Sequence, residues 1–298
     1  MKHNGSRNLL ATVLGLSIAI AMPTWAEIAK PEEQSKTAQA IQDQVDLESA
    51  KQAAENRKKI TKDAISAVQE SKNALKLLDE NKVDEALAAL ERVTGKLELI
   101  IARDPKLAFA PIDVAVNSYD LIALPETVKK VVEQAENHLE EYEVQAARKL
   151  LENLVSEIVI STTSIPLATY PQAIKATVPL IDEGKINEAK QDLQLALNTL
   201  VVTDRVIPLP VLRAETLLKD AEELSEKKER SEGDNENLES IFTEIQTQLE
   251  MAELLGYGKK SDFKTINEEL EKIKRKLDGN KSGTGWYDKV KKQISDLF

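Results

Sequence analysis

The sequence predicts an all-α protein: a helical bundle of repeated antiparallel helical hairpins joined by apolar loops that contain proline. Three observations predict this fold class. The 298 residues include only 10 glycines and 10 prolines, and few residues are aromatic, as is typical of helical proteins. Apolar residues recur at helical spacing, and no alternation of period two is bounded by hairpin turns. The third observation is an internal repeat, which identifies the architecture of a chain more directly than composition does.

The internal repeat is anchored on Ala86, Ala147 and Ala189. A Leu follows each anchor by four residues, an apolar residue by eleven and a Pro by nineteen: Leu90, Leu151 and Leu193; Leu97, Ile158 and Leu200; Pro105, Pro166 and Pro208. Each copy predicts a helix, a tight turn, a second helix and an apolar proline loop. The anchors lie 61 and 42 residues apart (147 − 86 and 189 − 147), which disfavours a tetratricopeptide solenoid, the alternative fold, because its period is about 34.

Residues 1–26 have the features of a secretory signal peptide. Lys2, His3 and Arg7 form a positive region, and an uncharged, mostly apolar run extends from Leu9 to Met22. This run is shorter than the roughly 20 residues that a membrane-spanning helix needs, so an uncleaved anchor is the weaker alternative. We expect cleavage near Ala26 and a periplasmic or secreted mature protein.

The mature chain is strongly acidic. Removing Lys2 and Arg7 leaves 40 − 2 = 38 Lys and Arg against 51 Asp and Glu, a net charge of −13. This balance disfavours nucleic acid as a partner, because phosphates attract basic surfaces. The chain has no cysteine. An exported protein without disulfides depends on its apolar core for stability.

Helical periodicity and turn residues divide the mature chain into four parts. We expect a peripheral N-terminal helix over 27–58, a repeat domain over 59–228, a C-terminal helical hairpin over 229–278, and a Gly/Ser linker with a short amphipathic helix over 279–298. Polar residues 230–237 are a candidate domain boundary. The helices predicted within the repeat domain and the C-terminal hairpin cover 59–78, 84–103, 113–121, 125–141, 144–160, 172–183, 186–203, 211–227, 238–255 and 263–277.

The three hairpin turns carry different residues at one offset: Asn81, Tyr142 and Gly184. Asn and Gly tolerate the left-handed conformation that ends a helix, whereas Tyr adopts it less readily. We therefore predict a negative φ at Tyr142 and positive φ at the other two residues.

No catalytic constellation and no cofactor or metal site is predicted. The mature chain has a single histidine, His138, and Ala135 occupies the place of the glutamate in a Glu-x-x-His pair. No Walker loop, GxGxxG or GxSxG sequence occurs. Acidic pairs stand at helix ends, where solvated capping residues are commoner than cation ligands: Asp79 with Glu80, and Asp182 with Glu183. The sequence therefore predicts a protein that is not an enzyme.

The three proline loops are the candidate binding sites, because loops seldom carry so many apolar residues. The seven candidates for contact with a ligand or a client protein are Leu107, Phe109, Ile165, Leu167, Tyr170, Ile207 and Leu209. One interpretation makes these loops core lids over the helix ends. The other makes them an exposed apolar groove, although exposed patches are usually limited in size.

The C-terminal helix carries a second candidate surface. Trp286, Val290, Ile294 and Leu297 share one face, and three lysines lie elsewhere on the helix. This face would make peripheral contact with a membrane, or it would dock on its own domain or on a partner.

Several segments together resemble the YfdX family over about 59–227. They are Ser156-Glu157-Ile158, Ile165-Pro166-Leu167-Ala168-Thr169-Tyr170-Pro171, Leu180-Ile181-Asp182-Glu183-Gly184-Lys185, Thr199-Leu200-Val201 and Ile207-Pro208-Leu209-Pro210. The resemblance implies an exported, all-helical bacterial protein that is associated with stress, particularly acid stress. It also implies pH-dependent assembly, hence a homo-oligomer, and a chaperone-like or small-molecule-binding role.

Taken with the acidic composition, the resemblance leads to two hypotheses. The first is a non-enzymatic periplasmic stress protein that binds client proteins when its carboxylates become protonated, near pH ~4. The second is a module that encloses a small apolar molecule, and a cavity lined by Phe109, Tyr170 and Leu209 would favour it.

Overall fold

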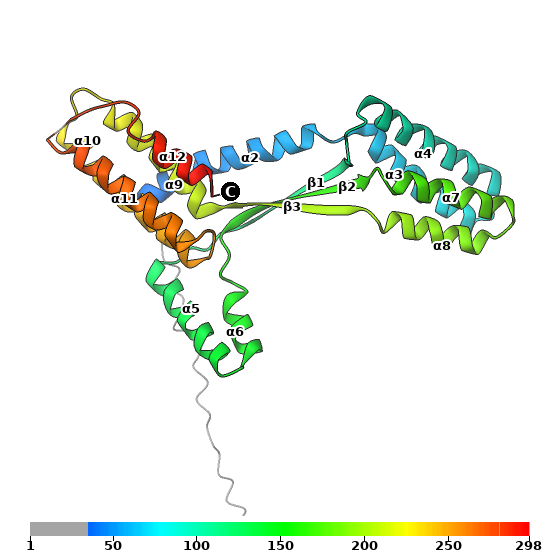
Figure 1. Ribbon diagram of the computed structural model, residues 1–298, viewed down its shortest axis with the longest axis horizontal. Helices are drawn as coiled ribbons and strands as arrows, with labels where there is room; N and C mark the ends of the chain where they lie inside the picture. Colours follow the sequence, from blue (N-terminus) through cyan, green and yellow to red (C-terminus); the bar gives the residue numbers. More distant parts are fainter. Residues whose placement is uncertain (1–34, 280, 298) are drawn as a thin grey trace, which may run out of the picture. The chain divides into compact units, whose positions relative to one another are not determined.

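The computed structural model describes residues 35–279 and 281–297. These residues form twelve helices and three strands, in the order shown in Figure 1. Their bounds are α1 (Lys36–Ala40), α2 (Gln42–Lys58), α3 (Lys62–Asp79), α4 (Val83–Arg103), β1 (Phe109–Tyr119), α5 (Pro125–Glu140), α6 (Val144–Leu151), β2 (Glu157–Pro166), α7 (Tyr170–Asp182), α8 (Ile186–Leu197), β3 (Val201–Pro208), α9 (Leu209–Ser225), α10 (Glu232–Leu254), α11 (Lys260–Leu277) and α12 (Asp288–Ser295). The largely helical class is confirmed. The predicted signal peptide, 1–26, lies outside the described residues.

The sheet is the main departure from the prediction. Its strands are antiparallel in the order β1-β2-β3, with Tyr119 opposite Glu157 and Glu157 opposite Pro208. The helix predicted over 113–121 is wrong, because these residues lie mostly in β1. The helices predicted over 144–160 and 186–203 end early, and their last residues enter β2 and β3. Both strands are rich in Val, Ile and Thr, whose branched side chains favour extended backbone.

The predicted proline loops are therefore largely strand ends. Pro166 is the last residue of β2 and Pro208 is the last residue of β3, whereas Pro105 lies in the turn before β1. The common offset of nineteen residues does not mark one structural position. Each hairpin is instead continued by a strand, in the order α3-α4-β1, α5-α6-β2 and α7-α8-β3.

The prediction for Tyr142 is wrong. Its φ is +62°, close to +58° at Asn81 and +74° at Gly184. The left-handed residue lets the Glu143 N–H donate to the His138 carbonyl at 2.7 Å, which closes the hairpin. The Tyr142 side chain is 90% exposed, so its own packing adds little. Closure of the turn thus outweighs a backbone cost of about 1–2 kcal/mol.

Replacing Tyr142 by Gly is expected to stabilise the protein, because Gly adopts positive φ without that cost. Gly also adds entropy to the unfolded chain, so the net gain should be about 0.5–1 kcal/mol. Thermal denaturation measures it. The matched control is Gly184→Ala, which introduces strain at the equivalent turn without a steric clash and should lower stability. Destabilisation by Tyr142→Gly would mean that the tyrosine side chain contributes to the fold.

Two clusters of buried side chains form the core. The first cluster joins α2, α9, α10, α11 and α12 to buried residues of β1 and β2. The second joins α3, α4, α7 and α8, with Ala110 of β1 and Ile165 of β2 beside them. We call these four helices the α3–α4–α7–α8 bundle (Figure 1). The first core crosses the predicted boundary at 228/229, because α9 packs on α10.

The predicted N-terminal helix over 27–58 is described from residue 35 onward. Ile41 and Val45 are buried in the first core, whereas Leu47 is 71% exposed. The polar helix α2 is thus held by a few apolar contacts on one face.

Candidate binding surfaces

The seven apolar residues predicted to bind a ligand or a client do not form one site. Ile165, Leu167 and Tyr170 are buried in the second core, and Leu107 packs against it. Leu209 is buried in the first core, and Ile207 packs against that core. Phe109 is 47% exposed. Phe109, Tyr170 and Leu209 therefore do not line a common cavity, and most of the seven residues lie in the two cores or against them.

Tyr170 is integrated into the bundle through a buried hydrogen bond. Its hydroxyl group donates to Ser71 Oγ at 2.9 Å, and Ser71 Oγ donates to the Ala67 carbonyl at 2.9 Å. Both side chains are fully buried. Burial raises the pKa of the Tyr170 hydroxyl, while the hydrogen bond with Ser71 opposes the shift. The contact joins α7 to α3, so Tyr170 has a structural role.

Ile207 does line a surface pocket of about 320 Å³ between β3 and α9. Its other lining residues include Arg205, Pro208, Val211 and Glu215. Burial raises the pKa of the Glu215 carboxyl, and the charge on Glu48 acts in the same direction. Only one of the seven predicted residues contributes to this pocket, which is partly polar.

The face of the C-terminal helix is covered by the chain itself. Val290 and Ile294 are fully buried in the first core, and Trp286 and Leu297 pack against it. Lys289 Nζ lies 2.6 Å from Glu269 Oε1, and this contact joins α12 to α11. In the structure, this face of the C-terminal helix therefore lies against the first core of the same chain. Among the described residues, no helix is both long and apolar enough to cross a bilayer.

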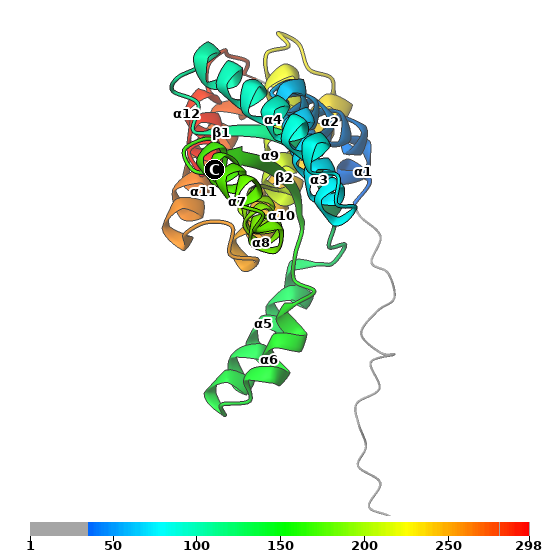
Figure 2. The same ribbon diagram turned by 90° about the vertical axis from the view of Figure 1, so that its right-hand side faces the viewer.

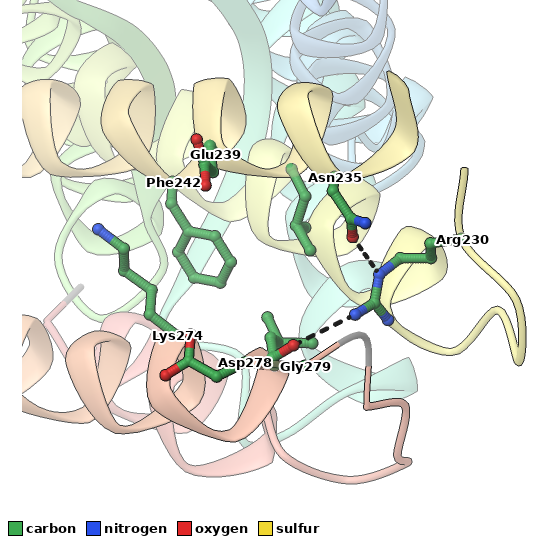
Figure 3. Close-up of a pocket in the computed structure, with 9 residues that line it drawn as sticks. Arg230, Asn235, Glu239, Phe242, Lys274, Asp278 and Gly279 are labelled. Atoms are coloured by element: carbon green, nitrogen blue, oxygen red, sulfur yellow. Dashed lines mark hydrogen bonds between the residues drawn. The ribbon is translucent and has the colours of Figure 1, made fainter. Parts of the chain in front are cut away.

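A second pocket, of about 240 Å³, lies between the start of α10 and the end of α11 (Figure 3). Its most buried charge is the guanidinium of Arg230, which donates to Asn235 Oδ1 at 2.9 Å, to the Ser225 carbonyl at 3.2 Å and to the Lys281 carbonyl at 3.0 Å. The predicted boundary over 230–237 therefore contains a buried arginine whose hydrogen bonds join three segments. These bonds give Arg230 a role in stabilising the fold.

A buried polar junction connects the sheet to the helices of the first core. Arg213 Nη2 on α9 lies 2.7 Å from Asp120 Oδ2, directly after β1. Ser156, directly before β2, donates from Oγ to Asp120 Oδ1 at 3.4 Å and from its backbone N–H to Tyr257 Oη at 3.0 Å. Tyr257 Oη in turn donates to Glu157 Oε2 at 2.8 Å. Burial is the main cause of the raised pKa of Tyr257.

Sequence reasoning missed this junction. One signal was available: Arg213 follows the apolar residues Leu209–Leu212, and a charge at that place must find a partner if the helix is buried. The partner could not be identified, because Asp120 is 93 residues away. The junction fixes the end of β1 and the start of β2 against the first core.

His138 lies near the tip of the α5–α6 hairpin. Its Nδ1 is 2.6 Å from Glu143 Oε2, and both side chains are partly exposed. This contact joins the two sides of the turn. His138 therefore acts locally in the hairpin.

Comparison with known proteins supports the resemblance to the YfdX family. Residues 67–206 match the YfdX protein family. No curated protein sequence matches the chain. Among solved structures, YfdX from Salmonella Typhi aligns with 50% of this chain and 93% of its own, at 15% sequence identity and a TM-score of 0.35. The range predicted from the sequence, 59–227, encloses residues 67–206, which match the YfdX family.

Proposed function

We propose that the chain is a non-enzymatic, exported stress protein that binds unfolding client proteins in acid. One observation carries the proposal: carboxylate ion pairs join the helices of the α3–α4–α7–α8 bundle over an apolar core. Loss of these ion pairs in acid would loosen the bundle and expose Ile165, Leu167 and Tyr170, three of the residues predicted to contact clients.

The ion pairs link helices within and between the two hairpins of the bundle. Arg92 Nη2 lies 2.9 Å from Glu70 Oε2, and Arg103 Nη1 lies 2.9 Å from Asp63 Oδ2, both joining α3 to α4. Two further pairs join the hairpins to each other: Lys175 with Glu98, at 2.7 Å between Nζ and Oε1, and Lys190 with Asp79. Acid would therefore act on contacts throughout the bundle.

The direction of the pH dependence follows from Glu70. The hydrogen bond and the charge of Arg92 hold the pKa of this carboxyl below its usual value of 4.5. A carboxyl with a lowered folded pKa stabilises the fold above its unfolded pKa, and this contribution is lost as pH falls through the folded pKa. Exposed pairs contribute only about 0.2–1 kcal/mol each, so several must be lost together. The change of net charge from −13 to strongly positive adds repulsion.

Client aggregation tests the proposal. An acid-sensitive enzyme is brought to pH ~3–4, where carboxyls become protonated, with and without the mature protein, and light scattering is recorded. We expect suppression of aggregation in acid and none at neutral pH. Equal suppression at neutral pH, or none in acid, contradicts the proposal.

A matched pair of variants links client binding to the bundle. Asp63→Asn, Glu70→Gln and Asp79→Asn together remove interhelical pairs, and we expect the pH at which clients bind to rise. The control is Glu80→Gln, because Glu80 pairs at 2.7 Å with Lys82 in the same turn and its lowered pKa has the same kind of cause. If both variants begin to bind clients at the same pH, loss of the interhelical ion pairs is not what triggers client binding.

The contact between α2 and α9 is expected to respond to acid in the opposite direction. Burial raises the pKa of Glu215 and of Asp220 on α9; Glu48 adds to the shift at Glu215, Glu223 adds to it at Asp220, and Lys219 opposes both. When these carboxyls are charged, at neutral pH, they oppose the packing of α2 on α9. Because their pKa values are raised, they become protonated at a higher pH than usual, and protonation removes this destabilisation. Hydrogen exchange, corrected for its intrinsic pH dependence, should show α2 better protected near pH 5 than at pH 7, whereas α3 and α4 lose protection only below about pH 4.5. Glu215→Gln should reduce the pH effect on α2, and an unchanged effect would exclude Glu215 as its source.

A further inference from the structure

The three hairpins close in the same way at their tips, which aligns them residue by residue. Each tip has one left-handed residue, and the next residue donates its N–H five positions back at 2.7–2.8 Å: Lys82 to Leu77, Glu143 to His138, and Lys185 to Leu180. The three hairpins, α3–α4, α5–α6 and α7–α8, are thus equivalent near their tips. Any difference in burial there reports what surrounds each hairpin.

Two of the hairpins cover each other. In the α3–α4–α7–α8 bundle, α3 contacts α8 and α4 contacts α7, so the first helix of each hairpin packs on the second helix of the other (Figure 1). This reciprocal arrangement is the contact pattern of a twofold axis. It buries equivalent side chains on both hairpins, Leu78 and Leu90 at 1% exposure and Ile181 and Leu193 at 3% and 0%.

The third hairpin presents the same face uncovered. Its equivalent side chains, Leu139 and Leu151, are 46% and 42% exposed, and Val144 is 54% exposed. Ala135 and Ala147, which face the interior of the hairpin, are buried at 1%. Helices α5 and α6 thus pack on each other, as Figure 2 shows, while the apolar face that the other two hairpins bury against each other is exposed to solvent.

Charges on this face are complementary to the same face of another copy. In the bundle, Asp79 on α3 pairs with Lys190 on α8, across the contact between hairpins. The tip alignment places Glu140 at the position of Asp79 and Arg148 at the position of Lys190. One hairpin therefore carries both halves of the ion pair, and both side chains are exposed. A twofold contact would form this pair twice.

We propose that the α5–α6 hairpin is the binding surface for a second copy of this chain. Two such hairpins pack with α5 of each on α6 of the other and complete a four-helix bundle between subunits. Leu139, Val144 and Leu151 form its apolar contact, and Glu140 of each copy pairs with Arg148 of the other. A twofold contact requires a self-complementary surface, and this hairpin has one.

The base of the hairpin is not part of this surface. Pro125 and Val128 in the first turn of α5 are already buried, and α5 contacts α10. The position that Ser71 occupies on α3 is Val132 on α5, and the position of Tyr170 on α7 is Val128. The polar contact of the intrachain bundle is therefore replaced at the base by apolar residues, and the distal half of the hairpin provides the pairing face.

Molecular mass in solution is the first test. Light scattering after size exclusion should show the mature wild-type protein as a dimer, and Leu139→Asp with Leu151→Asp should make it a monomer with unchanged far-UV circular dichroism. The control is Leu47→Asp, which alters an even more exposed apolar residue, on α2, and should leave the dimer intact. A wild-type monomer at high concentration, or a dimer unaffected by the double substitution, overturns the proposal.

Charge reversal distinguishes this twofold contact from any other. Glu140→Arg alone and Arg148→Glu alone each place two like-charged pairs in the dimer, which should weaken dimerisation about tenfold. Mixing the two variants should restore the wild-type affinity, because each copy then meets opposite charges at both pairs. Weak association of the mixture as well would overturn the proposed pairing.

Discussion

Replacing Asp120 by Ala is expected to lower the free energy of unfolding by about 3–5 kcal/mol, because it leaves a buried arginine without its counterion. The Arg213 side chain is 4% exposed, and its Nη2 is 2.7 Å from Asp120 Oδ2. Arg213 Nε already lacks a hydrogen-bond partner among the described residues. The charge cannot move to solvent without opening the first core, and a guanidinium cannot lose its proton at any relevant pH. Urea denaturation measures the effect.

The reverse substitution should cost less. The Asp120 side chain is 30% exposed, so water can solvate its carboxylate when Arg213→Met removes the partner. Asp120→Asn combined with Arg213→Met should recover much of the loss, because neither charge then remains. Equal losses of stability for Asp120→Ala and Arg213→Met would mean that an unpaired Arg213 and an unpaired Asp120 destabilise the fold equally. That result would contradict this burial argument.

The hairpins could be predicted because their signals are local. Amphipathic spacing and turn residues predicted 84–103 and 125–141, and the structure has α4 at Val83–Arg103 and α5 at Pro125–Glu140. The C-terminal hairpin, α10 with α11, was predicted on the same grounds. An i, i+4 pattern and a cap lie within one segment, so one sequence contains all that the prediction needs.

The strands could not be predicted in the same way, because their stability depends on partners far along the chain. Phe109 pairs with Pro166, and Glu157 pairs with Pro208. Residues 157–165 follow a helix without a strong turn signal, and their Ile, Val and Thr residues also fit a helical stripe. The left-handed Tyr142 is a similar case, because closure of the hairpin overrides the preference of a single residue.

The candidate binding residues were predicted from apolarity alone, which cannot distinguish a core lid from an exposed groove. Burial depends on the packing of distant segments, so Tyr170 is buried and Phe109 exposed although both stand in apolar stretches. The same reasoning missed the α5–α6 face. The sequence repeat that aligns Leu90, Leu151 and Leu193 contains no information about which hairpins find a partner within the chain.

Tyr170→Ala is expected to lower the free energy of unfolding by about 3–5 kcal/mol, the usual cost of a cavity left by a large aromatic side chain. Tyr170 has no exposed surface, and its ring fills the second core between α7 and α3. Tyr170→Phe keeps the ring and loses only the hydrogen bond to Ser71, so it should cost about 0.5–1.5 kcal/mol. Chemical denaturation at neutral pH distinguishes the two variants.

Phe109→Ala provides the comparison, because the sequence assigned Phe109 and Tyr170 to the same kind of site. Phe109 is 47% exposed, and its loss should change stability by less than about 1 kcal/mol. If Tyr170 lined a preformed ligand groove, Tyr170→Ala would leave stability near that of Phe109→Ala and would change binding instead. A large loss confined to Tyr170→Ala identifies it as a core residue, which a client can reach only after the bundle has opened.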